Sequence, residues 1–171
     1  MGSCLPRSFV IRDGALLWLQ EELVAKGLAR VYSLADNTVC IHQLLAREAE
    51  ARDRRLGVWG SWAYRIQSAD DLKRLDRLIH TYQLVEGKAV AVGQGAGRIY
   101  LNFAEDWRRD FTDVARKDVD AFAAAGIDLK ELAGKTIRVR GWLQWRNGPM
   151  IEATHPEQIE LLPDTSGKAA L

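Results

Sequence analysis

The clearest pattern in the chain is an alternation of apolar and polar residues over positions 135–160, which predicts two long strands joined by a tight turn. Ile137, Val139 and Leu143 fall on one face of the first strand. The other face carries Thr136, Arg138, Arg140, Trp142, Gln144 and Arg146. Asn147-Gly148 follows, and both residue types tolerate the positive φ of a two-residue hairpin turn. We therefore expect one face to build a core and the other to show its three arginines and its tryptophan to solvent.

The first third of the chain alternates between strand and helix patterns. The predicted elements are a strand over 9–13, a helix over 16–26, a strand over 28–32 and a helix over 38–56. Gly14 would end the first strand in a turn, and Gly27 and Gly57 stand where the two helices should stop. Trp59 would then return to the core. Residues 1–62 are thus predicted to form one segment, followed by a linker and a bridging helix over 63–81.

Five strands and one helix are predicted from position 82 onward. The strands cover 83–92, 98–103, 111–116 and the two halves of the hairpin, and the helix covers 118–125 between the third and fourth strands. Gly87 interrupts the alternation of the first strand, which predicts a bulge that lets a small barrel bend. The glycine-rich run 93–97 joins two strands and lacks a following Lys-Ser/Thr, so it predicts a hairpin loop and not a phosphate loop. This order is that of an OB-fold over residues 82–162, with a flexible tail at 163–171.

Composition narrows the classes of function. The chain has 171 residues, of which 47% are hydrophobic and 27% charged, so it is globular and long enough for one large domain or two small ones. Its formal net charge is +1, which excludes a protein that binds polyanions with its whole surface. Any nucleic-acid surface must come from a local cluster of side chains.

Cysteine and histidine usage predicts neither a disulfide framework nor a metal centre. Cys4 and Cys40 are the only cysteines, and together with the scattered His42, His80 and His155 they give no zinc-ligand spacing. We expect ordinary thiols and a structural His155. The chain has no apolar run of about 18 residues and no signal-peptide pattern at its start, which predicts no membrane association and a cytoplasmic location unless a secretion signal lies upstream.

Two sets of side chains on the predicted barrel are candidates for nucleic-acid binding. Arg98, Tyr100 and Asn102 alternate outward on the second strand and offer a cation for phosphate, a ring for stacking and an amide for a base edge. OB-folds bind oligonucleotides across this strand, its neighbour and the loops joining strands one to two and four to five. The alternative is an exposed strand face that merely prefers residues with high β propensity.

The second set belongs to the hairpin. Arg138, Arg140 and Arg146 interleave with Trp142, a combination that suits stacking and contact with a phosphate backbone. The same side chains could equally pack inside the protein. We expect Trp142 and Trp145 to pack between the two halves of the chain and Arg146 to be partly exposed beside the turn.

Two strings in the first segment carry a resemblance to a known family. DGALLWLQEELVAKGLARVYSLADN and LLAREAEARDRRLGVWG resemble the back half of a thermonuclease-like (staphylococcal nuclease-type) domain, over about residues 9–60. In that family the calcium-binding carboxylates, the glutamate that activates water and a first arginine lie on barrel strands before this segment. The resemblance therefore assigns no catalytic residue and no metal ligand here, and Arg7 departs from the family's second arginine motif. Calcium is implied only for a complete family member.

Residues 80–162, with the strings YLNF and VRGWLQWRNGPMIEATHPEQIE, resemble OB-type accessory domains that follow thermonuclease-like domains in bacteria. The expected fold class is α+β, mainly β: a partial nuclease-like barrel half with helices, then a five-stranded OB barrel with one helix. The expected function is weak binding of single-stranded nucleic acid without catalysis, with no cofactor. The alternatives are a fragment of a calcium-dependent phosphodiesterase, whose barrel a partner chain could complete, and a protein-interaction module.

Overall fold

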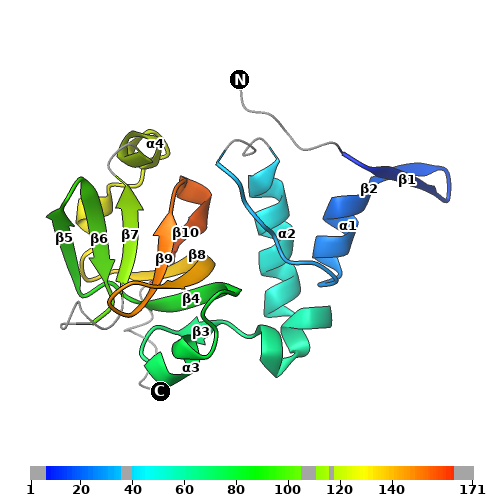
Figure 1. The fold of residues 1–171 in the computed structure, drawn as a ribbon. Helices are drawn as coiled ribbons and strands as arrows, with labels where there is room; N and C mark the ends of the chain where they lie inside the picture. The colour runs from blue at the N-terminus through cyan, green and yellow to red at the C-terminus, as the bar shows by residue number, and fades with distance from the viewer. Residues whose placement is uncertain (1–6, 36–39, 105–110, 116–117, 164–171) are drawn as a thin grey trace, which may run out of the picture. The chain divides into compact units, whose positions relative to one another are not determined.

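The computed structural model describes residues 7–35, 40–104, 111–115 and 118–163, and of residues 111–115 it describes the backbone alone. The chain divides into two compact units, Met1–Arg65 and Ile66–Leu171. Each unit is described by itself (Figure 1). Cys4 and residues 164–171 of the predicted tail over 163–171 lie outside the described residues.

Unit 1 opens with a two-stranded hairpin. Strand β1 (Phe9–Arg12) pairs antiparallel with β2 (Ala15–Trp18), and Asp13 and Gly14 make the turn with φ of 51° and 77°. Helix α1 (Leu19–Ala25) follows directly. The prediction that helix begins at position 16 is wrong by three residues, because residues 15–18 satisfy their backbone groups in the hairpin.

The rest of unit 1 is helix α2 (Ile41–Asp53) and two 3₁₀ turns, η1 (Gly57–Gly60) and η2 (Trp62–Tyr64). Val24, Val31 and Ile41 form the centre of its small core. The predicted strand over 28–32 is wrong: this segment is not assigned to a strand. The amide of Val31 instead donates to Oε1 of Glu48 at 2.7 Å, so a buried carboxylate takes the place of a neighbouring strand.

Two glycines hold the helix ends of unit 1 together. Gly27 and Gly57 both have positive φ, at 67° and 52°, and the amide of Val58 donates to the carbonyl of Gly27 at 2.8 Å. A Cβ on Gly27 would lie 2.2 Å from the carbonyl oxygen of Leu56.

Trp59 returns to the core as predicted and is 7% exposed. The expectation of an ordinary thiol is wrong for Cys40, which is disulfide-bonded.

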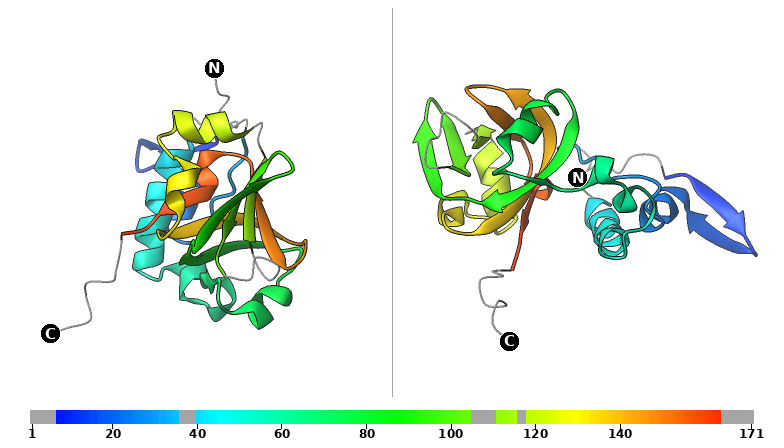
Figure 2. Two further views of the ribbon diagram at one scale, coloured as in Figure 1. Left: turned by 90° about the vertical axis from the view of Figure 1, so that its left-hand side faces the viewer. Right: turned by 90° about the horizontal axis from the view of Figure 1, so that it is seen from below.

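Unit 2 is a curled sheet with short helices (Figures 1 and 2). Its strands are β3 (Gln67–Ser68), β4 (Tyr82–Lys88), β5 (Ala91–Gly95), β6 (Arg98–Asn102), β7 (Phe111–Ala115), β8 (Thr136–Trp145), β9 (Pro149–Ala153) and β10 (Ile159–Leu161). Its helices are α3 (Leu72–Asp76), α4 (Val119–Ala124), and the 3₁₀ turns η4 (Leu129–Leu132) and η5 (Pro156–Gln158). Strand β6 pairs with β5 and β7, β7 pairs parallel with β9, and β8 pairs with both β9 and β4.

This pairing is that of an OB-fold, with β4 and β5 serving as one bent first strand. The bend lies at Ala89 and Val90: the amide of Ala89 donates to Lys135 beside β8, whereas the amide of Val90 donates to Asn102 of β6. The predicted bulge at Gly87 is wrong, since Gly87 keeps its register opposite Ile137. Glycine at this position instead allows close packing against Ala69, because a Cβ on Gly87 would lie 2.6 Å from Cβ of Ala69.

The core of unit 2 bears out the predicted alternation. Ile137, Val139 and Leu143 of β8 are at most 2% exposed, and Ile99 and Leu101 of β6 lie in the same cluster. The core also includes Ala69 and Leu75, with Leu78 and Ile79 packed against it. The segment predicted as a linker and bridging helix therefore contributes β3 and α3 to the barrel unit. The mixed α+β fold class with an OB barrel is confirmed.

Candidate nucleic-acid interface

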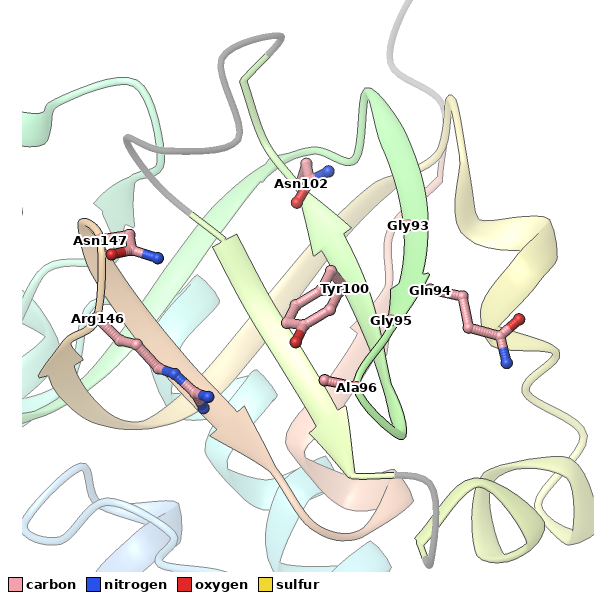
Figure 3. Close-up of a pocket in the computed structure, with 8 residues that line it drawn as sticks. All are labelled: Gly93, Gln94, Gly95, Ala96, Tyr100, Asn102, Arg146 and Asn147. Carbon is pink, nitrogen blue, oxygen red and sulfur yellow. The ribbon is translucent and has the colours of Figure 1, made fainter.

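A pocket of about 420 Å³ opens on the barrel surface where three segments meet. The β5–β6 hairpin, the outward face of β6 and the β8–β9 turn supply its walls (Figure 3). The lining residues are Gly93, Gln94, Gly95, Ala96, Tyr100, Asn102, Arg146 and Asn147. These segments are the second strand and the two loops through which OB-folds bind oligonucleotides. The sequence-based prediction named Tyr100, Asn102 and Arg146, and the structure brings these three to one pocket.

Tyr100 stands in the middle of this pocket, on β6 (Figure 3). Alternation along β6 places it outward, because Ile99 and Leu101 on either side are 4% and 0% exposed. Gly93 lies directly across the ladder from Tyr100, so no side chain opposes the ring on β5. The edge of the ring that faces β5 therefore meets backbone and not a side chain.

Polar groups reach the pocket from two directions. Asn102 projects from the same face of β6 as Tyr100, two residues along the strand. Arg146 and Asn147 come from the β8–β9 turn, in which Asn147 adopts a φ of 60° and the amide of Arg146 donates to Gly148 O at 2.8 Å. The turn is one residue longer than predicted, since β8 ends at Trp145 and β9 begins at Pro149. It extends Arg146 toward Tyr100 (Figure 3).

Arg98, the third predicted residue of β6, forms an ion pair with a carboxylate. Its Nη1 lies 3.0 Å from Oε1 of Glu152 on β9, and the two side chains are 25% and 33% exposed. The ion pair therefore spans β7, which lies between the two strands. Arg98 is close to the pocket but does not line it. Its charge is partly neutralised by Glu152 before any phosphate arrives.

The prediction that the outer face of β8 shows its arginines to solvent is wrong for Arg138 and Arg140. Arg138 donates to Oε2 of Glu86 at 2.9 Å and to Oε1 of Glu160 at 2.7 Å, and its side chain is 11% exposed. Arg140 is 3% exposed. The cause is β10, which pairs with β8 in the register Glu160↔Arg138 and brings a carboxylate over this face. Neither arginine lines the pocket.

Two tryptophans of β8 have large exposed surfaces. Trp142 is 48% exposed and meets the ring of Tyr82 edge to face, with centroids 6.2 Å apart. Trp145 is 61% exposed at the end of the strand. The expectation that both pack between the two halves of the chain stays a prediction.

His155 belongs to a buried polar cluster away from the pocket lining. The residue is 4% exposed, its Nδ1 lies 3.1 Å from the hydroxyl of Thr154, and its Nε2 has no hydrogen-bond partner among the described residues. Burial lowers the pKa of His155; of the charges around it, Glu157 and Asp118 oppose this shift and Arg140 adds to it. Burial therefore favours the neutral imidazole, and the structural role of His155 stays a prediction.

The described residues do not form a calcium site. Within the described ranges, no three His, Cys, Asp or Glu side chains lie close enough together to hold a metal ion. Calcium requires six to eight oxygen ligands, several of them carboxylates. In unit 1 the buried carboxylate of Glu48 is instead used by the Val31 amide and lies 3.7 Å from Arg52. The described part of unit 1 (residues 7–35 and 40–65) therefore does not fit the metal that a complete thermonuclease-like protein holds.

Sequence reasoning missed the contribution of the β5–β6 hairpin to the pocket. Gly93, Gln94, Gly95 and Ala96 were predicted to be only a connecting loop, yet they form one wall of it. This contribution depends on the β5–β6 register, which places Gly93 opposite Tyr100 and Gly95 opposite Arg98, on the outward face of the hairpin.

Comparison with known proteins gives a family match within the first unit. Residues 14–61 match the family model described as staphylococcal nuclease homologue, which confirms the resemblance of unit 1 to that family. No curated protein sequence matches the chain. Among the described residues, no helix is long and apolar enough to span a membrane.

Several solved structures are similar to part of the chain. They include asparaginyl-tRNA synthetase from Pyrococcus horikoshii (15% identity, 58% of this chain and 23% of that chain, TM-score 0.38). Aspartyl tRNA synthetase from Entamoeba histolytica is 10% identical over 60% of this chain and 22% of that chain, with a TM-score of 0.42. An OBody, AM1L10, solved bound to hen egg-white lysozyme, is 14% identical over 50% of this chain and 83% of that chain, with a TM-score of 0.35. The chain thus spans less than a quarter of the two synthetases, and the OB-fold assignment rests on its own strand pairing.

Proposed function

We propose that unit 2 binds single-stranded nucleic acid weakly through the pocket around Tyr100. The observation that carries the proposal is the convergence of the β5–β6 hairpin, β6 and the β8–β9 turn on one pocket that contains an aromatic ring, side-chain amides and a guanidinium. OB-folds use these segments to bind oligonucleotides. The volume of about 420 Å³ lies within the range of about 300–1,000 Å³ that is typical of small-ligand pockets.

Each group has a role in this proposal. The Tyr100 ring stacks on a base, the amide of Asn102 meets a base edge, and Arg146 meets a phosphate. Binding should be weak, because the described lining of the pocket contains one aromatic ring and Glu152 already neutralises part of the Arg98 charge. We leave Arg138 and Arg140 out of the face, since Glu86 and Glu160 bind them within the sheet.

The proposal is tested by comparing two substitutions of Tyr100. Tyr100→Ala removes the ring, and because one stacked base contributes roughly 1–3 kcal/mol, affinity should fall about tenfold or more. Tyr100→Phe keeps the ring and should retain most of the affinity. The measurement is fluorescence anisotropy with labelled 12-nucleotide DNA and RNA at fixed low salt. Equal affinity of the wild-type protein and Tyr100→Ala would contradict the proposal.

A second function is favoured by the exposed hairpin of unit 1. Phe9, Ile11 and Leu16 lie on this short sheet and are 46%, 78% and 66% exposed. Leu16 falls within residues 14–61, which match a nuclease family, and the other two lie just before them. Large apolar side chains on a two-stranded sheet are typical of strands that pair further. We infer that a partner chain or further strands complete a thermonuclease-like barrel here, and that any calcium and catalytic carboxylates would come from those strands. A module that only binds another protein is the weaker alternative.

A further inference from the structure

The outward face of β5 carries no side chain larger than a methyl group beside the pocket. Ala91, Gly93 and Gly95 share this face, and they lie opposite Asn102, Tyr100 and Arg98 in the antiparallel register. The wall beside Tyr100 is therefore made of backbone. On β6 the same face carries three large polar or aromatic side chains, so the hairpin is strongly asymmetric.

The two glycines lie along one edge of the Tyr100 ring. An ideal Cβ on Gly93 would lie 3.8 Å from Cβ and 4.0 Å from Cδ2 of Tyr100, and one on Gly95 would lie 4.0 Å from Cε2. These distances are ordinary van der Waals contacts, so a side chain would fit beside the ring without a clash. It would, however, rise from the strand next to the ring and occupy the space over its edge.

Backbone conformation does not explain either glycine. Gly93 and Gly95 do not have positive φ, in contrast to Gly97 at the hairpin turn with a φ of 74°. Glycine inside a strand weakens it through conformational entropy and often marks a close approach by a ligand or another backbone. At both positions a larger residue would therefore favour the strand, and the open space beside Tyr100 is what the glycines provide.

We infer that Gly93 and Gly95 determine access to Tyr100, keeping the ring open to one unpaired base of a single-stranded nucleic acid. This inference rests on the proposed function and names its ligand more narrowly. A base in a duplex is stacked on both faces and paired at its edge, so it has no face to offer the ring. A single strand can present one base to the pocket while Arg146 on the other side meets its backbone.

The test adds side chains to β5. Gly93→Val and Gly95→Val introduce a residue that favours strands and fills the space beside the ring. Thr136→Val is the control, because it places a valine on a strand of the same barrel, β8, at a residue that does not line the pocket. The probes are a fluorescein-labelled 12-nucleotide oligothymidylate, an RNA of equal length, and a 12-base-pair duplex. We expect both glycine variants to bind the single strands about tenfold more weakly, which is the loss of one base–ring stack, and the control to bind within about twofold of the wild type.

Graded substitutions make the test independent of stability. Gly93→Ala and Gly95→Ala add only the Cβ that the structure accommodates, so they should fold and lose less affinity than the valine variants. Unchanged affinity in the valine variants, or a loss that does not increase from alanine to valine, would overturn the inference while leaving the proposed function intact if Tyr100→Ala still loses affinity. Failure of the wild type to prefer single strands over the duplex would instead contradict the proposed function itself.

Discussion

Arg98, Arg138 and Arg146 stand on one barrel, and their partners separate their roles. Arg138 is held between carboxylates of β4 and β10, and Arg98 is held by Glu152, whereas Arg146 extends from a turn into the pocket. A charge that is already paired gains less from a phosphate, because its partner must be displaced or left near the new anion. Of these three arginines, Arg146 is the one that lines the pocket.

His155 is the residue at which pH should act on unit 2. Its pKa is lowered in the folded state by burial, whereas in the unfolded chain it has the ordinary value of about 6.5. The unfolded state therefore binds more protons in the interval between the two values, and folding stability decreases as pH falls. The contribution of a neutral His155 is fully present above about pH 6.5 and is lost as pH falls toward the lowered pKa.

This expectation is checked by urea unfolding of unit 2 between pH 7.5 and 5. His155→Phe keeps a ring and removes the titrating group, so its unfolding free energy should depend less on pH than that of the wild type. His80→Asn is the control at an exposed histidine of the same unit, and asparagine tolerates the φ of 66° at that position. An identical pH dependence in His155→Phe and the wild type would exclude His155 as the group responsible.

At the scale of the elements, the contact between Gly27 and Gly57 should control the stability of unit 1. Gly27→Ala must place a Cβ at positive φ and 2.2 Å from the carbonyl oxygen of Leu56, and neither backbone can move without breaking the bond from Val58. Left-handed backbone costs about 1–2 kcal/mol and overpacking about 1–3 kcal/mol, so we expect a loss of roughly 2–5 kcal/mol.

Gly14 provides the matched control for this substitution. It has a similar φ of 77°, but a Cβ there meets nothing within 4 Å, so Gly14→Ala measures the conformational cost alone. Chemical unfolding together with hydrogen exchange at the Val58 amide measures both variants. Equal losses for Gly14→Ala and Gly27→Ala would show that the contact between the two glycines contributes nothing.

Elements with a strong local pattern could be predicted from the sequence, and those that depend on distant partners could not. The alternation of β8 and the asparagine-glycine turn identified the hairpin, because period-2 burial is local. The burial of Arg140 depends on β10, a three-residue strand whose pairing partner lies about twenty positions earlier. The segment over 28–32 has strand-like residues, but a strand also requires a neighbour, and Glu48 binds its Val31 amide instead.

The same distinction applies to the candidate site. Tyr100 and Asn102 could be predicted from the alternation along β6 and the known binding face of OB-folds. The contribution of Gly93 and Gly95 became visible only with the β5–β6 register, because a glycine has no side chain whose character marks a face. Whether a glycine serves a turn or an open surface depends on its φ and on its neighbour across the ladder.

At the scale of the whole molecule, the two units differ in the features that support a role with nucleic acid. Unit 2 has a complete OB strand pairing with a pocket on the face that OB-folds use to bind oligonucleotides, whereas residues 14–61 of unit 1 match a nuclease family and the hairpin of unit 1 is exposed. The net charge of +1 gives the chain little nonspecific attraction to phosphate. Binding should therefore depend on the pocket more than on the overall electrostatic field, and salt should weaken it only by a small power of the salt concentration.

The chain by itself should not hydrolyse DNA or RNA, with or without calcium. Hydrolysis of the thermonuclease type requires oxygen ligands for the metal, a carboxylate that activates water and cations for the developing charge. Two described carboxylates of unit 1 serve other contacts: Glu48 accepts from Val31, and Glu21 accepts from Arg47, which lowers the pKa of Glu21. Loss of a general base alone reduces a rate by about 100-fold to 10,000-fold.

The assay is cleavage of labelled single- and double-stranded substrates in calcium or in chelator, with Glu48→Gln and Glu21→Gln as variants. A chelator-sensitive activity that purifies with the chain and is lost in either variant would place the catalytic carboxylates in unit 1 and contradict the prediction.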